Sequence, residues 1–514
     1  MQSFAALLLL ALPWLNPFAP GPSPAVAPWL VTLAASASLF LLASVHLRVV
    51  VNQTSFDQRW VRPIAQSWLL AGLISSVIGL LQYFGLTGAF EPWVNQTSWP
   101  GEAFANLRQR NQFASLTNIA LTALVWWVAM RSEAEAVAGG IARRTLWWVT
   151  LSAALLAVGN AASASRTGAL QLALVCALCT VWGKWREPLV RQVLLVALLA
   201  YALALLVLPW VAGFDLWQYG MAARLRTGDD ACASRLTLWS NVLHLIVQKP
   251  WLGWGWGELA YAHYAASYSG PRFCDILDNA HNLPLHLAVE LGVPLALLLC
   301  GACTWWVLRQ KPWRETDPVR QLAWSVLAII LLHSLLEYPL WYGPFQMALG
   351  LCIVLLWREQ PAHTFCNTGG NIKNKASNKL FWQVLRALLA TTLIFFCGAA
   401  ALDYRRVSQI YLPPESRDVA LRDDTLAKIR HSWLFTNQAR FAELLLTPLA
   451  RDNAQRTFDT AMSLLHYSPE PRVIEKLLES AVLLERDDVA QAHLAHYRAA
   501  FPVDHARWAT ANAR

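Results

Sequence analysis

A short polar sequence leads directly into a long apolar one between residues 275 and 292, DILDNAHNLPLHLAVELG. His281 and Asn282 therefore stand at a predicted boundary between water and a membrane. An asparagine followed two residues later by proline is typical of a helix N-terminus, and His286 and Glu290 then fall on one helix face. Imidazole exchanges protons near pH 7, and an ionisable residue inside an apolar segment is a functional candidate. We predict that His281 is catalytic and that Asn282 and Glu290 contact the substrate.

Two arginines outside this sequence have the chemistry to bind an anionic group. Arg166 lies in NAASASRTGAL, and Arg235 lies in CASRLTLWSNVL. The planar guanidinium fork matches phosphate oxygens, and its charge stabilises a leaving group that becomes more negative as its bond breaks. Together with His281, the two arginines would suit a pyrophosphate leaving group. The alternatives are a snorkelling interfacial side chain for Arg166 and an exposed surface charge for Arg235.

Two further sequences gather hydrogen-bonding side chains beside apolar segments. FANLRQRNQFASLTNI (104–119) precedes one predicted span, and HSLLEYPLWYGPF (333–345) interrupts two others at Pro339. Such side chains suit a polar ligand with many hydroxyls, whereas a solvated helix cap and an aromatic membrane turn are the respective alternatives. The predicted substrate-binding residues here are Arg108, Arg110, Asn111, Gln112, His333, Glu337 and Tyr342. No HExxH or DxD pattern is present, so neither a metal nor a cofactor is predicted.

The composition is that of a membrane protein. Of the 514 residues, 56% are hydrophobic and 14% are charged, and the formal net charge is +9. In a membrane protein such a basic excess indicates loops held on the cytoplasmic side, and no nucleic-acid-binding motif is recognisable. The 27 tryptophans suit the aromatic belts of many spans. The predicted partners therefore include membrane lipid but no nucleic acid.

Eleven apolar segments are long enough to cross a bilayer as helices, so the predicted fold is all-α and polytopic. The first contains no Lys or Arg in residues 1–10, so it is interpreted as a span, with a signal peptide as the alternative. The predicted spans are 4–20, 27–47, 64–84, 113–131, 144–162, 167–184, 189–212, 283–307, 320–336, 340–357 and 380–401.

Basic residues flank every second connection between these spans. Since Lys and Arg are retained in the cytoplasm, the even-numbered connections are predicted to be cytoplasmic. The N-terminus is then cytoplasmic, and the C-terminus is external. The same rule predicts that residues 85–112, 163–166 and 213–282 are external. His281, Arg166 and Arg235 would therefore share one side of the membrane.

The external parts have distinct compositions. Residues 402–514 are amphipathic, and helical periodicity near 415–431, 433–447, 452–466, 470–484 and 487–500 predicts a helical domain after a transmembrane domain of residues 1–401. The large loop 213–282 contains Cys232 and Cys274, for which a disulfide is permitted but not required. Its Gly- and Trp-rich sequence PWLGWGWGEL (250–259) lacks the GK[ST] ending of a phosphate-binding loop and is interpreted as a tight turn.

The order of these motifs resembles that of a known enzyme superfamily. HNLPLHLAVELG, SRTGAL and RLTLW followed by PWLGWGWGE resemble the O-antigen ligase and Wzy polymerase superfamily. FANLRQRNQFASL, HSLLEYPLWYGPF and RAAFPVDHARW resemble its bacterial protein O-oligosaccharyltransferases of the PglL (pilin glycosylation) type. The resemblance implies glycan transfer from undecaprenyl-pyrophosphate at the periplasmic face of the inner membrane. It also implies that His281 is the essential histidine and that Arg166 and Arg235 contact the pyrophosphate.

One departure from the family follows the first span, where NPFAPGPSPAVAPW has neither the His nor the Glu that the family often has there. The favoured hypothesis is that a Ser or Thr hydroxyl of an exported protein such as a pilin attacks the lipid-linked oligosaccharide, without ATP or nicotinamide. In a first alternative the acceptor is lipid A-core, as in an O-antigen ligase. In a second the chain is a transporter or flippase, which predicts repeated halves that the sequence does not contain.

Overall fold

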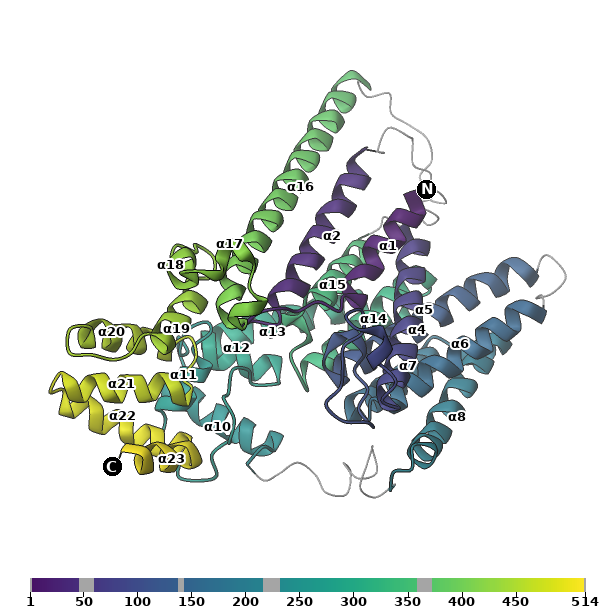
Figure 1. Cartoon of the computed structure of the whole chain (residues 1–514). Helices are drawn as coiled ribbons and strands as arrows, with labels where there is room; N and C mark the ends of the chain where they lie inside the picture. The colour runs from purple at the N-terminus through teal and green to yellow at the C-terminus, as the bar shows by residue number, and fades with distance from the viewer. Residues whose placement is uncertain (1, 46–59, 137–142, 216–231, 358–371, 513–514) are drawn as a thin grey trace. The chain divides into compact units, whose positions relative to one another are not determined.

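A computed structural model describes residues 2–45, 60–136, 143–215, 232–357 and 372–512. Over these ranges the chain consists of helices joined by turns and coil, without strands, which confirms the predicted all-α class (Figure 1). The chain divides into two compact units. The first unit contains Met1–Ala19, Pro24–Thr227 and Gln310–Ala399, and the second unit contains Pro20–Ser23, Gly228–Arg309 and Ala400–Arg514.

Seven helices of the described part are long and apolar enough to cross a membrane. They are α2 (Val26–Val45), α4 (Arg62–Tyr83), α5 (Arg110–Ala136), α6 (Arg143–Ala162), α8 (Pro188–Val211), α13 (Val293–Gln310) and α16 (Ile372–Ser408). Four shorter apolar helices are α1 (Gln2–Leu15), α7 (Arg166–Val181), α14 (Pro318–Ser334) and α15 (Gly343–Leu356). Helices therefore occur at all the predicted apolar segments, as expected of a multi-pass membrane protein.

Helix α5 forms the centre of the first unit. Of its apolar window, 89% is buried, and it packs against α4, α6, α7 and α14. Small residues permit this packing. A Cβ added at Gly72 of α4 would lie 2.3 Å from the Cβ of Ala120, and one added at Gly168 of α7 would lie 2.6 Å from the Cβ of Ala114. Close contact at small residues is a main source of helix association in membranes, and here it fixes the start of α7 beside α5.

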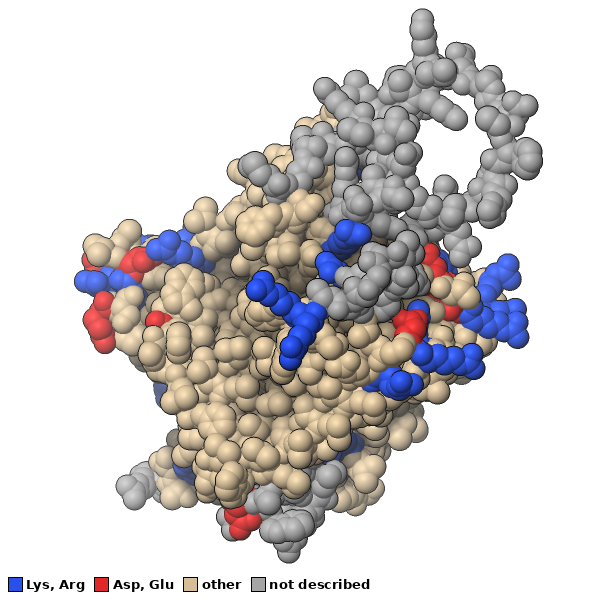
Figure 2. All heavy atoms as spheres, turned by 90° about the vertical axis from the view of Figure 1, so that its right-hand side faces the viewer, with Lys and Arg blue, Asp and Glu red and all other residues tan. Residues whose placement is uncertain are grey.

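Helices α6 and α8 pack against each other and carry apolar side chains on their outer faces. Trp147 and Trp148 of α6 are 66% and 69% exposed, and Leu199 of α8 is 62% exposed. Figure 2 shows that charged residues are sparse over a broad area of the face it presents. Exposed apolar surface of this kind suits contact with lipid.

The second unit combines the predicted external loop with the C-terminal tail. The loop contributes α10 (Arg235–Gln248), α11 (Leu259–Ala265) and α12 (Leu283–Leu291), followed by α13. The tail contains α17 (Val419–Arg422), α18 (Thr425–Ile429), α19 (Thr436–Leu446), α20 (Ala454–Leu465), α21 (Pro471–Leu483), α22 (Asp487–Ala500) and α23 (Pro502–Asn512). Helices α19 to α22 agree with four predicted segments. The segment 415–431 instead holds two short helices, because Asp424 between them is left-handed, with φ 47°.

Two apolar clusters hold this unit together, and α11 contributes to both. Leu259 and Ala262 are buried in a cluster with α10 and α12, where Leu245 and Val289 are also fully buried. Tyr264, two residues further along the helix, is 2% exposed in a second cluster formed by the tail helices. Because α11 has a buried face on each side, the loop and the tail pack as one body.

The predicted span 283–307 is wrong as a single continuous helix, because Gly292 separates α12 from α13. Gly292 has φ 86°, and a Cβ added there would lie 2.2 Å from the carbonyl oxygen of Trp251. The Gly- and Trp-rich turn therefore reaches the end of α12 directly. The N–H groups of Trp254 and Gly255 donate to the carbonyls of Val289 and Glu290 at 2.9 and 3.0 Å. These bonds satisfy carbonyls that the end of a helix leaves open, which confirms the predicted tight turn and explains its position.

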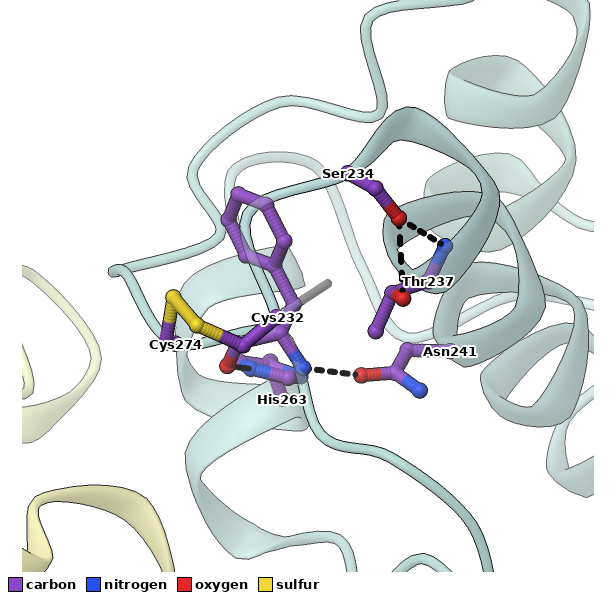
Figure 3. Close-up of a disulfide and its surroundings, with 7 residues drawn as sticks. Cys232, Ser234, Thr237, Asn241, His263 and Cys274 are labelled. Atoms are coloured by element: carbon purple, nitrogen blue, oxygen red, sulfur yellow. Dashed lines mark hydrogen bonds between the residues drawn. A yellow bond between two sulfur atoms is a disulfide. The ribbon is translucent and has the colours of Figure 1, made fainter. Parts of the chain in front are cut away.

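The possible disulfide between Cys232 and Cys274 is formed, with their Cα atoms 5.3 Å apart (Figure 3). The neighbouring backbone is held independently of the sulfur atoms. The N–H of Phe273 donates to Oδ1 of Asn241 at 2.8 Å, and its carbonyl lies 3.2 Å from Nε2 of His263. The disulfide thus ties the residues before α10 to the chain that leads towards His281.

Removal of this disulfide is expected to destabilise the second unit. The cysteines are 42 residues apart, and a loop of this length corresponds to about 4 kcal/mol of unfolding free energy in the chain-entropy model. We expect thermal unfolding of the purified full chain to show a lowered transition for the Cys232→Ser/Cys274→Ser variant. Cys303→Ser, at an exposed free cysteine, is the control. Equal transition temperatures for both variants would contradict this expectation.

Candidate active site

Three predicted polar regions of the first unit meet at Asn111, in the first turn of α5. Its Nδ2 donates to Oε1 of Glu337 at 3.1 Å, and its Oδ1 accepts from Oγ of Ser165 at 2.6 Å. Ser165 is the N-cap of α7, and its Oγ accepts from the N–H of Gly168 at 3.0 Å. Because each group has a defined donor or acceptor role, the Asn111 amide can be oriented in one way only. The structure thus brings together two predicted substrate-binding residues, Asn111 and Glu337, although they are 226 residues apart.

A second buried network lies deeper between α5, α7 and α14. Oγ of Ser115 lies 2.8 Å from Nδ1 of His333, and Nε2 of Gln171 donates to Oγ of Ser115 at 2.7 Å. All three residues have 0% exposure. His333 therefore lies in the interior of the helix bundle, four residues before Glu337.

The remaining candidates of the first unit have other partners. Arg108 donates to the carbonyl of Pro17, and Arg110 pairs with Glu102 at 3.5 Å. Gln112 is buried, with 2% exposure. The ring of Tyr342 stacks on that of Tyr338, with the ring centroids 5.8 Å apart. Arg110 and Gln112 lie in the first turn of α5, Arg108 precedes it, and Tyr342 directly precedes α15.

Arg166 is the first residue of α7, directly after Ser165. It is partly exposed, whereas Ser165 and Thr167 on either side are buried. The cap bond between Ser165 and Gly168 and the bond from Ser165 to Asn111 fix the backbone on which the guanidinium is carried. The helix dipole does not stabilise a cation at the N-terminus of a helix, so the position of Arg166 does not result from that interaction.

The second unit holds His281 in an uncommon backbone conformation. Its φ is 49°, in the left-handed region, which costs about 1–2 kcal/mol for a residue other than glycine. The N–H of His281 donates to Oδ1 of Asn279 at 2.9 Å, and Asn282 caps α12 by accepting from the N–H of Leu285 at 3.1 Å. His281 itself remains partly exposed. Strained residues of this kind cluster at functional sites, where the surrounding structure holds them in place.

The predicted pairing on one face of α12 is confirmed. Nε2 of His286 lies 3.3 Å from Oε2 of Glu290, and both side chains are 2% exposed. The N–H of Ala280 donates to Nδ1 of His286 at 3.4 Å. A nitrogen that accepts this bond carries no proton, so the neutral imidazole has its proton on Nε2, towards Glu290. Glu290 is thus directed at His286 inside the unit.

Arg235 is the first residue of α10, and Trp239 on the same helix binds the backbone directly before His281. Ser234 caps α10 by accepting from the N–H of Thr237 at 3.2 Å. Four residues after Arg235, Nε1 of Trp239 donates to the carbonyl of Ala280 at 3.1 Å. Side chains four apart on a helix lie on the same face, so Arg235 and Trp239 share one face of α10.

The two units divide the three predicted catalytic residues between them. Arg235 and His281 belong to the second unit, and Arg166 belongs to the first. Their convergence on one pyrophosphate therefore stays a prediction.

The sequence did not single out Ser165, Gln171 or Trp239. Ser165 had a usable signal as a serine directly before a helix, whereas the contacts of the other two arise only from tertiary packing.

The Asn111 network leads to a charge-sensitive prediction. Asn111→Asp would set a second carboxylate where Nδ2 now donates to Glu337, and we expect a loss of about 1–3 kcal/mol of unfolding free energy. Adding Glu337→Gln restores a donor opposite the new carboxylate. Thermal unfolding of the full chain should therefore show destabilisation by Asn111→Asp and recovery in the double variant. A double variant less stable than Asn111→Asp alone would show that the contact does not hold the two segments together.

Three family models match successive parts of the chain. The model described as protein glycosylation ligase matches residues 103–128, which include Asn111. The model described as O-antigen ligase matches residues 151–300, which contain Arg166, Arg235 and His281. The model of the C-terminal part of a virulence factor membrane-bound polymerase matches residues 321–514.

Two curated relatives from Acinetobacter baylyi are similar to the chain. A general O-oligosaccharyltransferase is 25% identical over 321 residues, which cover 61% of this chain and 54% of the relative. A ComP-specific O-oligosaccharyltransferase is 24% identical over 389 residues, which cover 75% of this chain and 62% of the relative. The chain thus spans a little over half to about three fifths of the length of these relatives. The candidate site residues lie inside the matched segments, and the chain is similar to protein O-oligosaccharyltransferases of the PglL type in the O-antigen ligase superfamily.

Proposed function

We propose that this protein transfers an oligosaccharide en bloc from undecaprenyl-pyrophosphate to Ser or Thr hydroxyls of exported proteins such as pilins. The observation that carries the proposal is the His281 turn. A partly exposed imidazole is held in a left-handed conformation directly before a capped helix, inside the segment that matches the O-antigen ligase model. The names of both relatives, which state O-oligosaccharyltransferase activity, support the same reaction class.

The reaction requires three tasks from the protein. A hydroxyl oxygen of the acceptor forms a bond to the first carbon of the sugar, and the bond from that carbon to the pyrophosphate oxygen breaks. His281 accepts the hydroxyl proton, for which a neutral imidazole is suited. Arg166 and Arg235 stabilise the pyrophosphate as it leaves with its added negative charge. The lipid pyrophosphate is itself the activated group, so the reaction needs no nucleotide or redox cofactor.

The polar residues of the first unit are proposed to bind the sugars and the acceptor. Asn111 and Glu337 present amide and carboxylate oxygens at the start of α5, with Tyr342 on the turn after α14. Arg108, Arg110 and Gln112 lie at the same end of α5, and Asn282 and Glu290 support the His281 turn from the other unit. Donor and acceptor groups of this kind suit a ligand with many hydroxyls.

We further propose that the chain crosses the bacterial inner membrane eleven times, with its C-terminus and its site in the periplasm. The basic even-numbered connections and the Cys232–Cys274 disulfide support this orientation, because disulfides form outside the cytoplasm. Alkaline phosphatase, which is active only after export, should be active when fused after residue 409 and inactive when fused in the 310–317 connection. The reverse activities would refute the orientation.

Purified protein in lipid vesicles tests the activity itself. With a lipid-pyrophosphate-linked oligosaccharide and a pilin-derived peptide, mass spectrometry should detect a glycopeptide whose added mass equals the complete oligosaccharide. Unmodified peptide, with the donor intact, would contradict the proposal. The same experiment separates an enzyme from a flippase, because a flippase moves the lipid without forming glycopeptide.

The match to the O-antigen ligase model favours one alternative, transfer of the glycan to lipid A-core. That acceptor is a sugar hydroxyl on a lipid, so the same His281 and arginine chemistry would serve. Lipopolysaccharide gels of a deletion strain distinguish the two acceptors. Loss of the O-antigen ladder would establish the alternative, whereas an intact ladder with unglycosylated exported proteins is the result that we expect.

A further inference from the structure

Ala280, directly before His281, is held through both of the peptide groups that join at its Cα. Its N–H, in the peptide with Asn279, donates to Nδ1 of His286 at 3.4 Å, and its carbonyl, in the peptide with His281, accepts from Nε1 of Trp239 at 3.1 Å. Ala280 has 0% exposure, so neither of these backbone groups has water as an alternative partner. The two bonds come from different helices, α12 and α10.

The orientation of these two peptide groups determines the direction of the next side chain. His281 is held at φ 49°, a conformation that an ordinary residue leaves unless its neighbours hold it. Asn279 and Trp239 hold the N–H and the carbonyl of the Ala280–His281 peptide, and His286 holds the N–H of the peptide before it. Rotation of either peptide group would move the imidazole of His281.

His286 is in turn held by a buried carboxylate. Nε2 of His286 faces Oε2 of Glu290 at 3.3 Å, and the backbone carbonyl of Glu290 accepts from the N–H of Gly255. The ring of Trp256 lies edge-on to His286, with centroids 6.1 Å apart. The Gly- and Trp-rich turn thus limits the positions open to both side chains. A carboxylate that accepts a hydrogen bond from one ring nitrogen of a histidine fixes which nitrogen carries the proton and how the ring is oriented.

We infer that Trp239 and His286, the latter oriented by Glu290, are positioning residues that hold the two peptide groups on either side of the Ala280 Cα and thereby aim His281 at the acceptor hydroxyl. Neither side chain touches the substrate. Their contribution is geometric, and a displacement of a catalytic group by about 1 Å can cost on the order of 100-fold in rate. This inference rests on the proposed transferase function of His281.

Two conservative variants test the inference in the vesicle assay with lipid-linked donor and peptide. His286→Phe keeps a ring but removes the acceptor for the Ala280 N–H, and Trp239→Phe keeps an aromatic ring but removes the indole N–H. We expect kcat to fall by roughly 10- to 100-fold for each, with KM for donor and peptide within about threefold of wild type. Because both act on the backbone of the same residue, Ala280, the fall in the double variant should be smaller than the product of the two single effects.

A matched control is His263→Phe, which changes another buried histidine of the same unit. His263 is 3% exposed, and its ring nitrogens contact Tyr268 and the carbonyl of Phe273 rather than Ala280. We expect this variant to keep kcat within about threefold of wild type.

The outcomes separate the inference from the function on which it rests. Absence of glycopeptide with wild-type protein would refute the proposed function. An active wild type with unchanged kcat in both His286→Phe and Trp239→Phe would overturn the positioning role alone. Equal falls in kcat for His286→Phe and His263→Phe would also overturn it, because a general loss of packing would then explain both. Trp239→Phe retains a large aromatic side chain, so it keeps the test decisive if His286→Phe fails to fold.

Discussion

Replacement of His281 by asparagine is expected to reduce glycan transfer by about 10²- to 10⁴-fold, the range associated with loss of a general base. Asparagine is the informative substitution because, like histidine, it is among the residues that tolerate the left-handed conformation observed at φ 49°. Alanine would remove the imidazole and strain the turn together. The asparagine variant therefore separates the loss of proton transfer from a loss of backbone geometry.

The measurement is the initial rate of glycopeptide formation by purified full-length protein with a lipid-pyrophosphate donor. His431→Asn, at an exposed histidine of the same unit, is the control and should behave as wild type. Unchanged thermal unfolding of His281→Asn would show that the unit is intact. A rate within threefold of wild type for that variant would remove His281 from the mechanism.

Replacement of either arginine by lysine is expected to have the second-largest effect on activity. Lysine keeps the positive charge but loses the planar fork that contacts two phosphate oxygens at once. We expect Arg166→Lys and Arg235→Lys each to lower the transfer rate by about 10²- to 10³-fold, the effect of removing one group that stabilises developing negative charge. Removal of a group that acts mainly in the transition state lowers kcat more than it raises KM.

Matched controls exist in both units. Arg191 of α8 and Arg451 in the tail are exposed, and lysine at these positions should leave the rate unchanged. A rise in KM for the donor without a fall in kcat would assign the arginines to ground-state binding. Rates equal to those of the control variants would show that the arginines are the snorkelling or surface residues considered from the sequence.

Local patterns predicted the parts of the site that depend on helix geometry. The spacing of His286 and Glu290 placed them on one face of α12, and the Asn-x-Pro sequence at Asn282 predicted the cap that the structure contains. Short-range rules suffice for this pair and this cap, because each partner lies within about one turn of helix. Asn111 and Glu337 were predicted individually, since each lies where an apolar segment begins or ends, but their mutual contact was not.

Features that depend on contacts between distant segments were not predictable in this way. Hydropathy treats residues 283–307 as one apolar run, whereas the break at Gly292 depends on a carbonyl of Trp251 that approaches its Cα. The burial of Tyr264 in the tail core joins the loop to the tail, although the sequence treats them as separate external parts. No local signal reports the bond from Trp239 to the carbonyl of Ala280, 41 residues away.

The central claim is that His281, Arg166 and Arg235 act on one lipid pyrophosphate. The most direct test is an electron cryomicroscopy structure of the full chain in a lipid nanodisc with a non-hydrolysable donor analogue. The account predicts both guanidinium groups within hydrogen-bonding distance, about 3 Å, of the same pyrophosphate, with the His281 imidazole facing the first sugar carbon. A pyrophosphate bound away from either arginine, or with His281 directed away from the sugar, would contradict it.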